Sequence, residues 1–153
     1  MHRKSARSFS MTFALALAAL SAVPASHAQD HKAINLSNAK GLPFSDGIVA
    51  GKTLFVAGQE GSDDSGKLVA GGIGPETKAA LDNIEKVVKA AGFEMSDIVS
   101  VTVYLADIHD FADMNKVYKS VLPDPKPARA TIQAAALVND ARIEIAAIAV
   151  KKK

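Results

Sequence analysis

Hydrophobic and polar residues alternate along this chain with two different periods, and these periods separate its predicted helices from its predicted strands. Between residues 75 and 91, apolar side chains recur every three or four positions, as on one face of a helix. Pro75 is typical of a first helical turn, and Gly92 of the position that follows a helix. A second stripe of this kind spans 111–122 and predicts another helix, which Pro123 ends.

Five further segments have the composition or the alternation of β-strands. Residues 98–105, "IVSVTVYL", place Val99, Val101, Val103 and Leu105 on one face of a strand and polar residues on the other. The remaining segments are 48–49, 53–57 (ended by Gly58), 130–136 and 142–150. The order β-β-α-β-α-β-β predicts an α+β fold, with a mixed β-sheet and two helices packed on one face.

The last predicted strand is apolar on both of its faces. Ile143, Ile145, Ala147 and Ala149 share one face, while Ala146, Ile148 and Val150 share the other with Glu144. Helices on one side of the sheet cover only one of these faces. We therefore expect the second face to be covered by other copies of the chain in an oligomer.

The first 28 residues have the pattern of a secretory signal peptide. A basic start precedes the apolar run "MTFALALAALSAV", and the small residues Ser26 and Ala28 follow at the positions that a signal peptidase requires. We expect cleavage after Ala28 and a periplasmic or secreted protein with no membrane attachment afterwards. Residues 29–40 are polar and are predicted to be a flexible lead-in, so that 41–153 form one domain.

Removing the signal peptide changes the charge of the chain. The full sequence has 18 Lys and Arg against 16 Asp and Glu, and residues 1–28 include Arg3, Lys4, Arg7 and no acid, which leaves 15 bases and 16 acids. A nearly neutral chain gives no electrostatic argument for nucleic-acid binding. The absence of cysteine excludes disulfides, thiolate chemistry and zinc bound by sulfur.

Two segments could have either a structural role or a ligand-binding role. The acids of "DIHDFAD", from Asp107 to Asp113, lie where a helix N-terminus favours negative charge, and we prefer that interpretation to a metal site, because His109 is the only plausible imidazole ligand. The segment "GGIGPE" precedes a helix but lacks the Gly-Lys-Ser/Thr ending of a phosphate-binding loop. No arrangement of Ser, His and Asp suitable for nucleophilic catalysis is evident.

Arg129 is the cation that best fits a binding site. It follows Pro125 and Pro127, which restrict the loop, and it precedes an apolar strand. The residue could be solvated or paired with an acid. However, a guanidinium group binds carboxylates through two parallel hydrogen bonds, so a small anionic ligand is the alternative.

The segments "PARATIQAAAL" and "RIEIAAIAV" resemble the C-terminal signature of the RidA/YjgF family of reactive intermediate deaminases. The resemblance continues through "VTVYLADIHDFADMNKVY", "ALDNIEKVVKAAG", "LFVAGQ" and "GLPFSDGIV", and so covers about residues 41–150. It implies a chorismate-mutase-like α+β fold and a homotrimer with three clefts between subunits. It also implies hydrolysis of 2-imino acids or enamines to 2-keto acids and ammonia, with no metal or organic cofactor.

The same resemblance assigns the site residues. Arg129 stands where the family arginine binds the substrate carboxylate, and Asn115 matches the asparagine of the cleft. Gly58 and Gln59 match the backbone turn that lines the pocket, and Thr131 is included among the implied substrate-binding residues.

Three positions depart from the family pattern. Phe44 replaces a tyrosine, Ala57 replaces a serine, and Ala146 replaces the second glutamate of "EIEAIA", which is thought to hold the attacking water. Glu144 lies on the same strand face as Ala146, about 6.5–7 Å away, and could substitute for the missing carboxylate through a water molecule.

These departures leave two functional hypotheses. The first is a 2-imino acid deaminase whose activity is weak or altered because the carboxylate at position 146 is missing. The second is a non-catalytic protein of the same fold that binds small carboxylates or another partner. Names used in the family also suggest ribonuclease or translation-inhibitor roles, against which the near-neutral charge and the expected export both argue.

Overall fold

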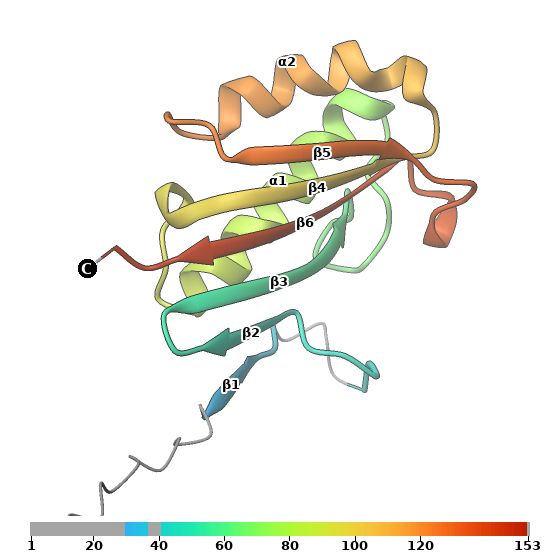
Figure 1. Cartoon of the computed structure of the whole chain (residues 1–153). Helices are drawn as coiled ribbons and strands as arrows, with labels where there is room; N and C mark the ends of the chain where they lie inside the picture. Colours follow the sequence, from blue (N-terminus) through green and yellow to red (C-terminus); the bar gives the residue numbers. More distant parts are fainter. Residues whose placement is uncertain (1–29, 37–40, 153) are drawn as a thin grey trace, which may run out of the picture.

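The computed structural model describes residues 30–36 and 41–152, which form a β-sheet layer covered on one face by two helices (Figure 1). The expected signal peptide, residues 1–28, lies outside the described residues. The helices are α1 (Ile73–Ala90) and α2 (Phe111–Val121). The strands are β1 (His31–Ile34), β2 (Gly47–Ala50), β3 (Thr53–Glu60), β4 (Ile98–Leu105), β5 (Ala128–Gln133) and β6 (Ile143–Val150).

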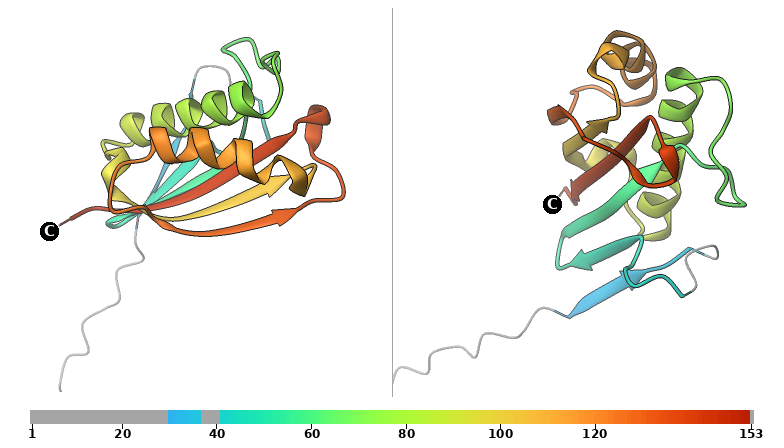
Figure 2. Two further views of the ribbon diagram at one scale, coloured as in Figure 1. Left: turned by 90° about the horizontal axis from the view of Figure 1, so that it is seen from above. Right: turned by 90° about the vertical axis from the view of Figure 1, so that its right-hand side faces the viewer.

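The strands are arranged in the order β1-β2-β3-β6-β4-β5, and only β4 and β5 pair in parallel. Helix α1 connects β3 to β4, and α2 lies in the crossover between the parallel strands β4 and β5. Both helices lie on the same side of the sheet (Figure 2). The predicted α+β class, mixed sheet and one-sided helices are confirmed. No helix in the described part of the chain is long and apolar enough to cross a membrane.

The core lies between the sheet and the helices. Leu81, Ile84 and Val88 of α1 and Met114 of α2 are almost completely buried against the sheet. Tyr118 of α2 is also buried, with 5% of its surface exposed. The helical stripes read from the sequence therefore form the core as predicted, except that Phe111 at the start of the second stripe is 40% exposed. Helix α1 begins at Ile73, two residues before Pro75, and the φ of +77° at Gly92 fits the predicted end of the helix.

The predicted lead-in at 29–40 contains a strand, β1, which pairs with β2 at the edge of the sheet. Of its four residues only Ile34 is buried, so β1 lacks the apolar alternation of a core strand. The strand predicted at 130–136 is shifted to Ala128–Gln133. Both differences concern edge strands, in which solvent-exposed residues weaken the hydrophobic pattern.

A register irregularity in β4 changes the predicted face of Val99. The pairing between β4 and β6 shifts between Ile98 and Ser100. Ile98 is consequently buried, whereas 48% of the Val99 surface is exposed. The prediction that Val99 shares a face with Val101 is therefore wrong, because strict alternation ignores such a shift.

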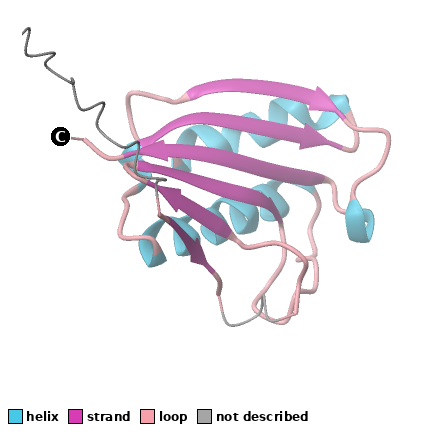
Figure 3. Cartoon of the chain, turned by 60° about the horizontal axis from the view of Figure 1, so that its bottom comes forward, coloured by secondary structure: helices cyan, strands magenta, loops and turns pink. Residues whose placement is uncertain are grey.

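Figure 3 shows the face of the sheet that the helices do not cover. Several large apolar side chains on this face are exposed. Phe55 of β3 is 47% exposed and Ile132 of β5 is 50% exposed, since each alternates with residues directed toward the helices. Val99 and Val150 add to this surface, which we call the open face. Its apolar character agrees with the pattern read from the last strand.

Candidate functional site

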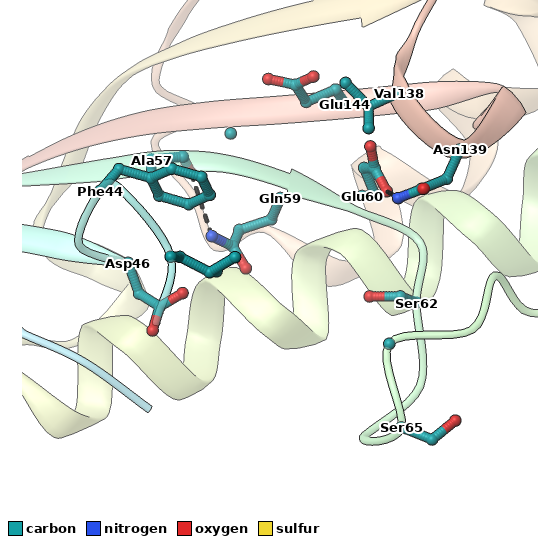
Figure 4. A pocket seen from close by; sticks show the side chains of 13 residues that line it. Phe44, Asp46, Ala57, Gln59, Glu60, Ser62, Ser65, Val138, Asn139 and Glu144 are labelled. Carbon is teal, nitrogen blue, oxygen red and sulfur yellow. Dashed lines mark hydrogen bonds between the residues drawn. The ribbon is translucent and has the colours of Figure 1, made fainter. Parts of the chain in front are cut away.

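A hollow of about 630 Å³ lies where the end of β3 meets the start of β6 (Figure 4). Its walls come from the loop before β2, from β3 and the loop that follows it, and from the short 3₁₀ helix η4 (Val138–Asp140) with β6. The predicted residues among its lining are Phe44, Ala57, Gly58, Gln59 and Glu144. The structure thus brings together five of the nine site residues inferred from the sequence.

A bulge in β3 shapes the floor of this hollow. Val56 pairs with Ala147 and Gln59 pairs with Ile145, so Ala57 and Gly58 together face the single residue Ala146. The strand was predicted to end at Gly58, but it resumes after the bulge and continues to Glu60. Bulges redirect backbone groups and side chains, and this one brings Gly58 under the Glu144 side chain.

The loop before β2 is hydrogen-bonded to the bulge. The backbone N–H of Ala57 donates to the carbonyl oxygen of Asp46 at 2.9 Å. The buried carboxylate of Asp46 in turn accepts a hydrogen bond from the Leu36 backbone N–H at 2.7 Å. These contacts hold the loop that carries Phe44, whose ring lies at the rim of the hollow and is 55% exposed.

The Glu144 carboxyl group lies directly over Gly58. A β-carbon added to Gly58 would be 1.8 Å from Glu144 Oε1, so this arrangement requires glycine. Partial burial raises the pKa of Glu144 above its ordinary value, and the negative charge of Glu60 raises it further. Ala146 is not among the residues that line the hollow. The side chain from position 144 therefore supplies a carboxyl group to this site.

Arg129 does not line this hollow. It is on the edge strand β5, which β4 and β6 separate from β3, a distance of about 14 Å across three strand spacings. Its guanidinium group is directed to the helix side, where the carbon Cζ lies 4.5 Å from the centroid of the Tyr118 ring and 5.5 Å from that of Phe111. Nη1 lies 3.9 Å from the Met114 sulfur.

Two other predicted site residues lie outside the hollow, on β5 and α2. Thr131 follows on the same face of β5, and Asn115 follows Met114 in α2. Thr131 Oγ1 and the Tyr118 hydroxyl are buried and have no hydrogen-bond partner within the described part of the chain. Burial raises the pKa of Tyr118, and the charge of Arg129 partly opposes that effect. The arginine group and the Glu144 hollow are two separate parts of one protomer's surface.

The acidic cluster after β4 has the structural role that the sequence favoured. Asp107 Oδ1 accepts a hydrogen bond from the His109 backbone N–H at 2.9 Å and caps the 3₁₀ helix η3 (Ile108–Asp110). Asp110, which precedes α2, forms an ion pair with Arg142 at 2.7 Å. Among the described residues no group of three or more His, Asp or Glu side chains is arranged to hold a metal ion.

Glu60 and Asn139 are among the lining residues that were not predicted from the sequence. Glu60 follows Gln59 in β3 and stands opposite Glu144 across the β3–β6 pair. Asn139 Nδ2 donates a hydrogen bond to Glu60 Oε2 at 3.0 Å. Glu60 lies beyond the strand predicted at 53–57, and Asn139 lies 79 positions further along the chain. Only the extension of β3 past its bulge brings these residues together, and no local pattern signals that extension.

Comparisons with known proteins agree with this geometry. A family model described as Endoribonuclease L-PSP matches residues 37–151. The 2-iminobutanoate/2-iminopropanoate deaminase of Bos taurus is 46% identical over 110 residues, which cover 71% of this chain and 80% of that protein. A RutC family protein of Pyrococcus horikoshii is 44% identical over 111 residues, covering 72% and 88%. The crystal structure of the YjgF gene product of E. coli matches with a TM-score of 0.73 and 32% identity, covering 79% and 99%.

Proposed function

The chain belongs to the RidA/YjgF family, and from this premise we propose that it hydrolyses 2-imino acids, or their enamine tautomers, to 2-keto acids and ammonia. The observation that carries the proposal is the Glu144 carboxyl group, held over Gly58 in a hollow large enough for a small organic acid. Relatives with more than 40% identity are named deaminases of this kind.

A complete site requires a second subunit. Within one chain, Arg129 lies on the far edge strand and on the opposite side of the sheet from Glu144. We propose that the chain forms a homotrimer in which the open face is covered and Arg129 of a neighbouring copy approaches each hollow. The exposed side chains Phe55 and Ile132 support this proposal, because a monomer rarely leaves so many large apolar residues in water.

In this arrangement the residues have distinct roles. Arg129 binds the substrate carboxylate with two parallel hydrogen bonds and orients the imine carbon toward the hollow. The Glu144 carboxylate accepts a proton from a water molecule as the water oxygen bonds to that carbon. The same proton passes to the nitrogen and gives a neutral carbinolamine. The Glu144 carboxylate then transfers the carbinolamine hydroxyl proton to the nitrogen, the C–N bond breaks, and ammonia leaves as the C=O bond forms.

Glu144 thus performs the role that the sequence analysis gave to the residue at position 146. Phe44 and Ala57 lack the hydroxyl groups of the family pattern, so substrate binding at the rim depends on contact with the phenyl ring and on backbone groups of the bulge. No step of this mechanism requires a metal or an organic cofactor.

Export remains part of the proposal. We propose that residues 1–28 direct the chain out of the cytoplasm, where it would act on imines released outside that compartment. N-terminal sequencing of the exported protein should begin at Gln29. An exported protein that retains Met1 would contradict cleavage.

The central test forms the imine in place with an amino-acid oxidase and follows its decay. The wild-type protein should accelerate the decay above the rate in buffer, and Arg129→Ala should reduce kcat/KM at least tenfold by removing the carboxylate contact. Equal rates for wild type, Arg129→Ala and buffer would exclude the deaminase function. Calorimetry with 2-keto acids would then measure whether the protein is a carboxylate-binding protein instead.

A further inference from the structure

We propose that Glu60 is a positioning residue for the proton transfers of Glu144. Its carboxylate, fixed opposite Glu144 across the β3–β6 pair, sets the pH range in which Glu144 exchanges its proton. The kinetic part of this inference rests on the proposed function, whereas the interaction between the two carboxyl groups can be measured without it.

The backbone fixes the proximity of the two acids. Glu60 and Glu144 are register partners in antiparallel strands, so their β-carbons are about 4.5–5.5 Å apart. Like charges at such positions repel each other, and both side chains line the same hollow (Figure 4). Loss of a proton from Glu144 therefore places a second negative charge beside Glu60.

Asn139 limits the freedom of Glu60 to move away. Its side-chain amide donates to Glu60 Oε2 at 3.0 Å from the 3₁₀ helix η4. Asn139 has a φ of +57°, a conformation that Asn adopts more readily than most residues. The hydrogen bond holds the Glu60 carboxyl group at the hollow.

No cation among the described lining residues offsets this repulsion. The titratable residues paired with Glu144 on the adjacent strands are Glu60 of β3 and Tyr104 of β4. Asp46, from the loop before β2, lines the same hollow, and its carboxylate accepts a hydrogen bond from the Leu36 backbone N–H. Arg142 precedes Glu144 by two residues, but its guanidinium group is bound to Asp110. The pKa of Glu144 is correspondingly raised, with burial as the larger cause and Glu60 as the second.

A raised proton affinity suits the proposed reaction. The carboxylate must accept a proton from water and later release it to nitrogen, and a group that titrates nearer to neutral pH can perform both steps. We infer that Glu60 contributes this adjustment without contacting the reacting atoms.

The deciding experiment is a ¹³C NMR titration of the glutamate carboxyl groups in the whole protein, with the Glu144 signal assigned by its loss in Glu144→Gln. Glu60→Gln preserves shape and removes the charge. This substitution should lower the pH at the midpoint of the Glu144 titration. The proton affinity of Glu144 should fall by up to about threefold relative to the wild type. A midpoint that is unchanged in Glu60→Gln would overturn the inference.

Two further variants define the interaction. Glu85→Gln is the matched control, because Glu85 is on α1 and pairs with Lys89 at 2.7 Å, away from the hollow. It should leave the Glu144 midpoint unchanged, and an equal shift in Glu85→Gln and Glu60→Gln would refute a specific effect. Asn139→Gly tolerates the positive φ but removes the amide, so it should lower the midpoint by less than Glu60→Gln does.

The kinetic measurement separates this inference from the proposed function. If the protein is a deaminase, kcat should depend on pH through the ionisation of Glu144. In Glu60→Gln this part of the pH dependence should move to lower pH. A shifted Glu144 midpoint, with no turnover in the wild type or in any variant, would reject the deaminase function and support the interaction between the two carboxyl groups. Turnover with an unshifted midpoint would reject the interaction and leave the deaminase function standing.

Discussion

The guanidinium carbon of Arg129 lies 4.5 Å from the centroid of the Tyr118 ring, within the range of a cation–π interaction. Arg129 is on β5 and Tyr118 on α2, so this contact joins the edge strand to the crossover helix beside it. Tyr118 is buried, and its ring thus gives the long arginine side chain a fixed support. An arginine held in this way loses less conformational freedom when it binds a carboxylate.

Replacing the Tyr118 ring should therefore weaken substrate binding. We expect Tyr118→Leu to raise KM by about 2- to 10-fold, as the loss of a partly buried cation–π contact would require, with a smaller change in kcat. Tyr118→Phe is the control. It keeps the ring and removes a hydroxyl without a partner in the described structure, so KM should change little and stability should not fall. Equal KM increases in both variants would exclude support by the ring.

Gly58→Ala should displace the Glu144 carboxyl group. The new methyl group would occupy the position of Oε1, and the flexible Glu144 side chain would swing away at little cost to the fold. If Glu144 is the acid–base group, kcat should fall by about 10²- to 10⁴-fold. Gly74→Ala in α1 is the matched control, because its β-carbon would meet no atom closer than 3.9 Å. Steady-state kinetics and thermal unfolding of both variants would measure the contrast.

Glu144 should reduce stability as the pH rises. Its pKa is higher in the folded protein than the ordinary value of an unfolded glutamate, so its protonated form favours folding and this contribution is lost as pH rises through the folded pKa. Glu144→Gln should therefore gain stability relative to wild type at pH 7.5 compared with pH 4. The effect should be small because the group is only partly buried. Denaturant unfolding at both pH values would test the sign, and a relative gain at pH 4 instead would contradict it.

Mixed oligomers should recover activity from two inactive variants. When Arg129→Ala and Glu144→Gln subunits are unfolded and reassembled together, some hollows receive an intact Glu144 from one subunit and an intact Arg129 from its neighbour. Random assembly in a ring should restore about one quarter of the wild-type sites. The separately refolded variants, mixed only afterwards, are the control. A mixture with no more activity than its components would show that both residues act within one chain.

The hydrophobic pattern was sufficient to predict the two helices, the mixed sheet and the apolar open face, because these depend on burial repeated over many residues. It was insufficient at β1, where only Ile34 of the strand is buried. It also failed at Val99 and at Gly58, where an irregular register interrupts the period of two. Such shifts depend on the partner strand and cannot be seen in one segment.

The residues of the candidate site could likewise be predicted only in part from the sequence. The resemblance identified Phe44, Gly58 and Gln59, which line the hollow. Strand alternation identified Glu144 as a possible substitute for the carboxylate missing at Ala146. The resemblance gave no indication of Glu60 or of Asn139, because their approach depends on the bulge in β3 and on a contact between residues far apart in the chain. It also could not show that Arg129 rests on Tyr118, since that contact joins a helix to a strand.

Two strands, β6 and β4, separate β5 at the edge of the sheet from β3, and this separation affects how the activity of such a protein depends on its concentration. In the proposed trimer, Glu144 of one subunit and Arg129 of its neighbour form a complete site only when the subunits associate. Specific activity should then fall on dilution as subunits separate, so that the concentration of the protein itself governs how fast each molecule works.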